Sequence, residues 1–225
     1  MRKATRADVI SYFLLALYAG LLVYLSLAHE MWRDEVRALS IVQTSENLLD
    51  LFSRLRNEGH PSLWYLVLYG GSALWQSPLV MPLLSLLIAL FAAIVFLRSA
   101  PLPLFIKALW LFGFYPLYEY SVVCRSYGLG MLFLFLFLSG FANRKQHPWR
   151  TALCLACMAN TSAFAWIVSA ALSLSLAFEY LLAWRSGSQR ISAKLLGSAL
   201  FVMAAHALAA FQMWPDTKTV VSGVH

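Results

Sequence analysis

The sequence has little charge. Only 12% of its 225 residues are Asp, Glu, Lys or Arg, against about a quarter in a typical soluble domain. Its three cysteines are too few for a disulfide framework, and no internal repeat or low-complexity segment is present. Apolar residues are abundant at 61%, more than a soluble globule of this length can bury. The composition therefore excludes a disordered chain, a secreted disulfide scaffold and an ordinary soluble enzyme, and it indicates an integral membrane protein.

The net charge of +7 comes from 17 basic and 10 acidic residues. The basic residues form short clusters between apolar runs, and they do not alternate with aromatic residues as in a nucleic-acid-binding surface. We therefore interpret the excess as a sign of membrane orientation and expect the lipid bilayer, and no nucleic acid, as a partner.

Long apolar runs predict the spans, because about 20 helical residues cross the roughly 30 Å hydrocarbon core. Run 61–76 is short and broken by Gly70-Gly71, which favours an interfacial or re-entrant segment. Run 151–183 is too long for one crossing, so we expect a break near residues 160–162 and two short crossings. The prediction is one all-α membrane module over residues 1–225, with about seven transmembrane helices. The runs are 9–28, 61–76, 79–97, 103–118, 126–142, 151–183 and 195–214.

Positively charged residues favour cytoplasmic loops. An arrangement in which run 61–76 does not cross fully agrees with that rule, whereas a crossing by this run would invert the bias. The first arrangement places the N-terminus in the cytoplasm and the C-terminus outside. The outer side then holds six basic residues: Arg33, Arg37, Arg54, Arg56, Arg125 and Lys218. The cytoplasmic side holds the other eleven: Arg2, Lys3, Arg6, Arg98, Lys107, Arg144, Lys145, Arg150, Arg185, Arg190 and Lys194.

The outer face also collects most of the acidic residues, in two loops at about 29–60 and 119–125. In the first loop, Ser45 or Thr44 is placed to cap a juxtamembrane amphipathic helix with Leu48, Phe52 and Leu55 as its apolar stripe. The outer acids are Glu30, Asp34, Glu35, Glu46, Asp50, Glu58, Glu119 and Asp216.

Asp34 and Glu35 follow the first span directly and are the first candidates for chemistry. Neighbouring helical residues point about 100° apart, so the two carboxylates cannot both face one substrate atom. One of them is a candidate general base, and the alternative is a solvated charge pair. Arg125, in the second loop, carries a planar fork suited to phosphate, and lipid-borne phosphate would arrive at this depth.

Three motifs in this order resemble the GT-C superfamily of membrane glycosyltransferases. They are Asp34-Glu35, then the string His60-Pro61-Ser62-Leu63-Trp64-Tyr65, then Arg125-Ser126-Tyr127. The most similar branch contains the protein O-mannosyltransferases and the aminoarabinose transferase of lipid A. Ser62 stands where this branch has a second proline. The seven-span layout is similar to the family's N-terminal module, so the resemblance implies a chain that is short at its C-terminal side, a fragment or a minimal form.

The resemblance implies a sugar transfer, with inversion, from a polyprenyl-phosphate donor to a hydroxyl of a lipid, glycan or protein acceptor. The reaction would take place on the outer face of the plasma (inner) membrane. Asp34 would be the base, Arg125 with Tyr127 would contact the phosphate, and Glu35, His60 and Glu119 would be further site residues. Some family members use a divalent cation (Mg²⁺ or Mn²⁺) and others do not, so the sequence leaves the metal open.

Asn160 is a further candidate because it faces the outer cavity if run 151–183 breaks there; an interhelical hydrogen bond is the alternative. Two other functions remain open. A transporter of a lipid-linked substrate would carry ionisable residues at mid-membrane depth, where only His206 is found. A non-catalytic subunit or fragment would agree with the short length.

Overall fold

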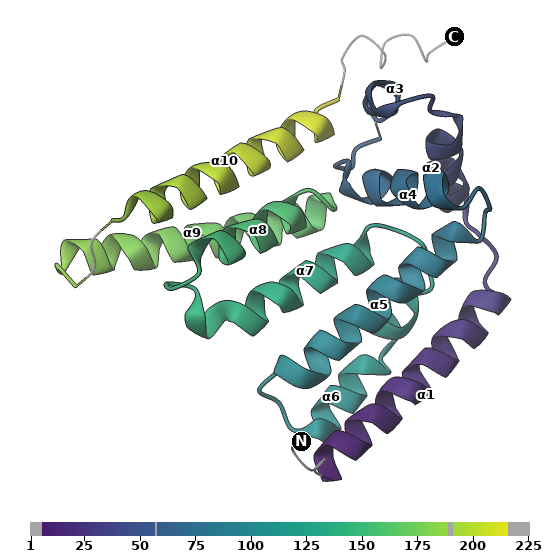
Figure 1. Ribbon diagram of the computed structural model, residues 1–225, viewed down its shortest axis with the longest axis horizontal. Coiled ribbons are helices and arrows are strands. Elements are labelled where there is room, and N and C mark those ends of the chain that lie inside the picture. Colours follow the sequence, from purple (N-terminus) through teal and green to yellow (C-terminus); the bar gives the residue numbers. More distant parts are fainter. Residues whose placement is uncertain (1–5, 57, 189–190, 216–225) are drawn as a thin grey trace.

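The computed structural model describes residues 6–56, 58–188 and 191–215, and in these ranges the chain is helical, without strands (Figure 1). The all-α prediction is therefore confirmed. Arg2, Lys3, Arg190, Asp216 and Lys218, which entered the sequence argument, lie outside the described residues. The elements are α1 (Arg6–Ala28), α2 (Arg33–Thr44), α3 (Leu48–Arg54), α4 (Leu63–Leu74), α5 (Val80–Ser99), α6 (Leu104–Leu111), the π-helix η1 (Tyr115–Glu119), α7 (Tyr127–Gly140), the 3-10 helix η2 (Phe141–Asn143), α8 (Pro148–Ala159), α9 (Ala163–Arg185) and α10 (Ala193–Met213).

Within the described ranges, four helices are long and apolar enough to cross a membrane: α1 (from Asp8), α5, α9 and α10. The predicted count of seven is therefore wrong. Run 103–118 forms only the eight-residue α6, followed by the five-residue η1. Pro116 lies in the first turn of η1, and a proline cannot continue the α-helical hydrogen-bond pattern that precedes it. Run 126–142 ends its α-helix at Gly140 and closes with η2.

The predicted break in run 151–183 is confirmed. α8 ends at Ala159, and α9 begins at Ala163 with the Ser162 side chain accepting a hydrogen bond from the backbone N–H of Ala165. The Ser169 hydroxyl donates to the Leu155 carbonyl at 2.8 Å, so the two helices fold back on each other. The expectation of two short crossings is only half right, because α9 has the full 23 residues of a span and α8 has 12.

Run 61–76 forms α4, which has 12 residues and is too short to count as a span. The predicted break at Gly70-Gly71 is wrong, because α4 continues through both glycines. Gly71 instead allows α5 to approach closely: a Cβ at this position would lie 2.7 Å from Leu84 Cδ1 and 3.0 Å from Val80 Cγ2.

The amphipathic helix of the first loop is α3, but its predicted caps are wrong. Asn47 caps it by accepting the backbone N–H of Asp50 at 3.0 Å, since the helix begins later than expected. Of the predicted stripe, only Leu55 is buried, together with Leu51, whereas Leu48 and Phe52 are exposed.

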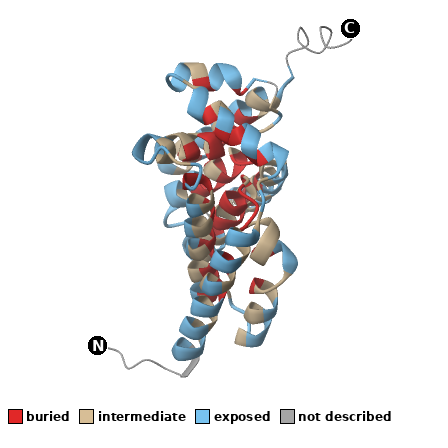
Figure 2. Ribbon diagram, turned by 90° about the vertical axis from the view of Figure 1, so that its right-hand side faces the viewer, coloured by how far each residue is buried: buried red, intermediate tan, exposed pale blue. Residues whose placement is uncertain are grey.

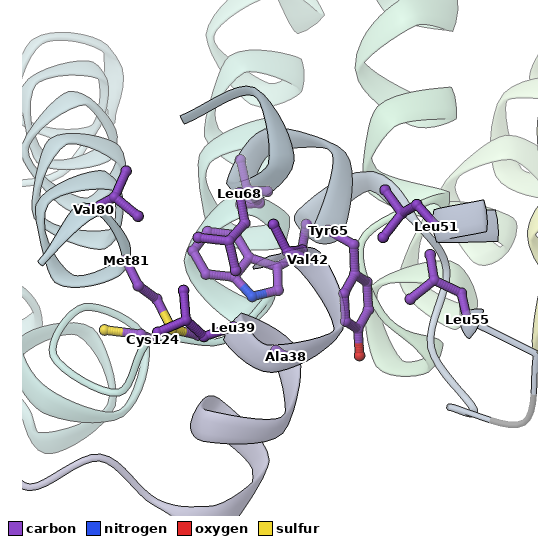
Figure 3. Close-up of a cluster of buried hydrophobic side chains, with 12 residues drawn as sticks. Ala38, Leu39, Val42, Leu51, Leu55, Tyr65, Leu68, Val80, Met81 and Cys124 are labelled. Atoms are coloured by element: carbon purple, nitrogen blue, oxygen red, sulfur yellow. The ribbon is translucent and has the colours of Figure 1, made fainter. Parts of the chain in front are cut away.

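The short helices α2, α3 and α4 gather at the end of the helical layer that lies opposite the N-terminus (Figure 1). We call these three helices together the cap. A shared apolar core holds the cap to α5. Figure 3 shows α2 side chains against α4, with α3 on one side and α5 on the other, through Ala38, Leu39, Val42, Leu51, Leu55, Tyr65, Leu68, Val80 and Met81.

The outward faces of the long helices are apolar and exposed, whereas buried residues gather in the interior and in the cap (Figure 2). Leu27 is 84% exposed, Leu174 71% and Phe164 69%. Apolar surface on this scale needs lipid rather than water around it, which supports an integral membrane protein.

Candidate functional site

The cap brings Asp34 and Arg125 together although they are far apart in sequence. Asp34 lies in the first turn of α2, and Arg125 lies in the loop before α7. Arg125 Nη1 lies 3.3 Å from Asp34 Oδ2. The Asp34 side chain is 59% exposed and that of Arg125 only 23%, so the carboxylate is accessible to solvent.

Glu35, in contrast, is fully buried and ties the two loops to each other. One oxygen, Oε1, accepts the backbone N–H of Cys124 at 2.7 Å. The other, Oε2, accepts the backbone N–H of Trp32 at 2.8 Å and lies 3.0 Å from His29 Nε2. Glu35 lines neither cavity described below, and its buried hydrogen bonds hold the two loops in position.

His29 extends the buried network, since its Nδ1 lies 3.0 Å from the Tyr118 hydroxyl. Cys124 is also enclosed, and burial raises the pKa of its thiol to about 12. Cys124, the residue before Arg125, is therefore bound to Glu35 at the start of α2, and Glu35 in turn contacts His29, the residue after α1.

Asp34 and Arg125 line a cavity of about 380 Å³, which we call the polar pocket. A second carboxylate, Glu58, also lines it and is held by Arg37, whose Nε and Nη2 donate to it over 2.6–3.1 Å. The hydrogen bonds to Glu58 and its negative charge raise the pKa of Arg37. The complete lining is Arg33, Asp34, Arg37, Ala38, Glu58, His60, Trp64, Tyr65, Cys124, Arg125 and Ser126.

A larger cavity of about 1210 Å³, which we call the apolar groove, runs between the cap and α10. Its walls come from α3, α4, α8 and α10, and aliphatic and aromatic side chains predominate. Two hydrogen bonds join these walls: the Ser62 N–H donates to Gln212 Oε1 at 2.9 Å, and the Leu63 N–H donates to the Asn160 carbonyl at 3.1 Å. The lining is Leu49, Phe52, Ser53, Leu55, Arg56, His60, Ser62, Leu63, Leu66, Ala156, Cys157, Asn160, Phe201, Ala204, Ala205, Leu208, Phe211, Gln212, Trp214 and Pro215.

His60 is the residue common to the two linings. Its Nε2 lies 3.5 Å from Arg125 Nη2. Burial and the nearby charge of Arg125 lower the pKa of His60 below its ordinary value, so the imidazole is neutral at pH 7.

The remaining predicted residues lie around these cavities in different ways. Tyr127 supports Arg125, whose guanidinium carbon lies 5.1 Å from the ring centroid, a cation–π geometry. Asn160 lines the apolar groove, and its amide also makes the interhelical hydrogen bond, 3.2 Å to the Ala205 carbonyl. Glu119 lies at the end of η1 and lines neither cavity.

Sequence reasoning missed the pairing of Arg37 with Glu58 and the pocket-lining side chain of Trp64. Two local patterns could have found them. Arg37 is three residues after Asp34 on a helix, and so lies on the same face. Glu58 and Trp64 flank the His60-Pro61-Ser62 part of the motif.

Across the described ranges, no three His, Cys, Asp or Glu side chains are grouped so that they could hold a metal ion. The divalent cation therefore stays a prediction. Comparison of the chain with family models, with curated proteins and with solved structures finds no match.

Proposed function

We propose that this protein is a membrane glycosyltransferase of the GT-C type. It moves a sugar from a polyprenyl-phosphate donor to an acceptor hydroxyl on the outer face of the plasma (inner) membrane. One observation carries the proposal: a polar pocket with a carboxylate and an arginine shares the lining residue His60 with a large apolar groove. A polyprenyl-phosphate sugar has the same two parts, a polar head and a long apolar tail.

Asp34 is the base in this proposal. An acceptor hydroxyl must lose its proton as it attacks a sugar carbon with oxocarbenium character, and a positioned carboxylate takes that proton. The exposure of Asp34 supports this role, because an acceptor can reach it. Inversion follows from a single displacement at the sugar carbon.

Arg125 stabilises the phosphate that leaves. Its planar fork can bind two phosphate oxygens, and a cation beside the leaving group favours the charge that develops there. In the free protein this guanidinium is paired with Asp34 at 3.3 Å. Donor phosphate gives Arg125 a second anion, which weakens its hold on Asp34 and leaves the carboxylate free to accept a proton.

The apolar groove holds the prenyl chain. The stretch of α10 that lines it, from Phe201 to Gln212, corresponds to about 17 Å at 1.5 Å per helical residue. Burial of the chain against these side chains supplies affinity through the hydrophobic effect.

The test uses purified protein in lipid nanodiscs with a radiolabelled decaprenyl-phosphate sugar and a panel of lipid, glycan and peptide acceptors. We expect the wild-type protein to transfer the label and Asp34→Asn to lose transfer while it still inserts and folds. Donor binding without turnover would instead favour a transporter or a non-catalytic binding subunit. Undiminished transfer by Asp34→Asn would rule out Asp34 as the base.

A further inference from the structure

His60 occupies a rigid point of the chain between the two cavities. Gly59 precedes it with φ +69°, a backbone conformation that favours glycine. Pro61 follows it and is buried, and the proline ring fixes its own φ. The next two backbone N–H groups bond to Gln212 and Asn160. The backbone that carries the His60 imidazole is therefore held in place.

The contact with Arg125 determines which ring nitrogen of His60 carries the proton. A guanidinium only donates hydrogen bonds, so Nε2, which faces Arg125 Nη2 at 3.5 Å, must act as the acceptor. The ring is neutral because of its burial and its cationic neighbour. In a neutral imidazole the other nitrogen then carries the hydrogen, so Nδ1–H is a donor.

This donor is buried, and no group in the described part of the chain accepts from it. The indole Nε1–H of Trp64, in the polar-pocket lining, is likewise buried without an acceptor in those ranges. Leaving a buried donor unsatisfied is costly, and such groups in a folded protein call for an explanation. Two such donors belong to residues that line the same pocket as Arg125. This combination suits a ligand that only accepts hydrogen bonds, and an ionised phosphate ester is such a ligand.

We infer that His60 Nδ1–H and Trp64 Nε1–H are hydrogen-bond donors to the phosphate of a long-chain isoprenoid phosphate, and that His60 sets the point where head and tail separate. The inference rests on the proposed function and assigns substrate-recognition roles within its site. His60 suits this boundary because it lines both cavities, whereas Arg125 and Trp64 line only the polar pocket.

The test compares variants that keep different nitrogens of the ring. Asparagine can place an amide N–H near the position of Nδ1, whereas glutamine reaches the position of Nε2. Binding of decaprenyl phosphate to the full chain is measured in phosphatidylcholine nanodiscs for the wild type, His60→Asn, His60→Gln and Trp64→Phe. Thermal denaturation shows that each variant folds.

We expect His60→Gln and Trp64→Phe each to bind decaprenyl phosphate about ten- to a hundredfold more weakly, the range for a lost hydrogen bond to a charged group. We expect His60→Asn to stay within about threefold of the wild type, because it restores the donor. Equal affinities for His60→Asn and His60→Gln would overturn the inference while leaving the proposed function intact. Absence of wild-type binding would overturn both.

Two competitors distinguish the possible sources of the phosphate. We expect neither inorganic phosphate nor phosphatidic acid to displace decaprenyl phosphate at equal concentration. Displacement by inorganic phosphate would show a free-phosphate site and overturn the role of the groove. Displacement by phosphatidic acid would show a site for any lipid phosphate and overturn the isoprenoid assignment.

Discussion

The two cavities differ in almost every property although they share a residue. The polar pocket has a volume of about 380 Å³ and contains the ion pairs Asp34–Arg125 and Arg37–Glu58. The apolar groove has a volume of about 1210 Å³ and offers mostly hydrocarbon. A ligand that satisfied only one of them would leave the other in contact with lipid or water. The difference indicates a ligand with a small anionic head and a long apolar tail.

The cavities also differ in how they are held together. The wall of the polar pocket around Arg125 depends on a buried carboxylate, Glu35, which accepts the Cys124 N–H. The apolar groove lies between elements remote in sequence, and its walls meet at the bonds that Ser62 and Leu63 make with α10 and α8. Changes in the pocket should therefore affect the chemistry or the binding of the phosphate head, and changes in the groove should affect only the binding of long chains.

The largest effect is expected from Asp34→Asn, which removes the base and leaves the groove unchanged. General-base catalysis contributes about 10²–10⁴-fold to a rate, so the turnover number should fall by that factor while donor affinity changes little. Asp50→Asn, on α3 and outside both cavities, is the control and should retain full turnover. A fall in donor affinity with unchanged turnover would show that Asp34 binds substrate instead.

Arg125→Ala should weaken binding of decaprenyl phosphate about ten- to a hundredfold, because a charge-assisted contact to the phosphate is lost. Arg125→Lys keeps the positive charge but lacks the planar guanidinium fork, so its affinity should lie between those of the wild type and Arg125→Ala. Equilibrium binding in nanodiscs gives the affinities, with Arg54→Ala as a control on α3. If Arg125→Ala bound the donor as tightly as the wild type, the phosphate would have to lie elsewhere.

Glu35→Gln should act on stability. Glutamine cannot accept all the hydrogen bonds that the carboxylate receives from Trp32 and Cys124 while facing His29, and hydrogen bonds to a charged group contribute about 1.5–3 kcal/mol. We expect the free energy of unfolding in detergent to fall by about this amount. The exposed Glu46→Gln should change it by less than about 0.5 kcal/mol. Equal stability of the two variants would contradict the positioning role of Glu35.

Ala204→Trp should fill part of the apolar groove. If the bulk displaces about two methylene groups of the chain, affinity falls about tenfold, at roughly 0.8 kcal/mol for each methylene. The loss of affinity should appear with decaprenyl phosphate but not with geranyl phosphate, whose chain is too short to reach the introduced indole ring. Ala207→Trp, exposed on the same helix and outside the groove lining, should affect neither. If Ala204→Trp lost the same affinity for decaprenyl phosphate and for geranyl phosphate, the groove would not be the binding site of the long tail.

Hydrophobic pattern was sufficient to predict the helical class, the short α4 region and the break near Asn160. It failed on the number of spans, because an apolar run does not reveal where the helix inside it stops. Run 103–118 has a single charged residue, Lys107, yet α6 ends at Leu111 and η1 follows with Pro116 in its first turn. Geometry of this kind depends on local backbone hydrogen bonds, which a window average does not record.

The candidate site shows the same division. Motif order brought Asp34, His60 and Arg125 into one hypothesis, and the structure places all three at the polar pocket. The helical angle between Asp34 and Glu35 predicted that they face different ways, which is confirmed. That Glu35 would be fully buried, or that a groove would form against α10, could not be predicted, because both depend on contacts between segments far apart in sequence.

The central claim is that one isoprenoid phosphate occupies both cavities, and photo-crosslinking tests it most directly. A decaprenyl phosphate with a diazirine in its tail is bound to the protein in nanodiscs and irradiated, and the labelled peptides are mapped by mass spectrometry. We predict labels on the groove face of α10, at residues such as Phe201 and Leu208, that excess unlabelled decaprenyl phosphate removes. Labels spread over the lipid-facing surfaces of α1 and α9, and unaffected by the competitor, would contradict the account.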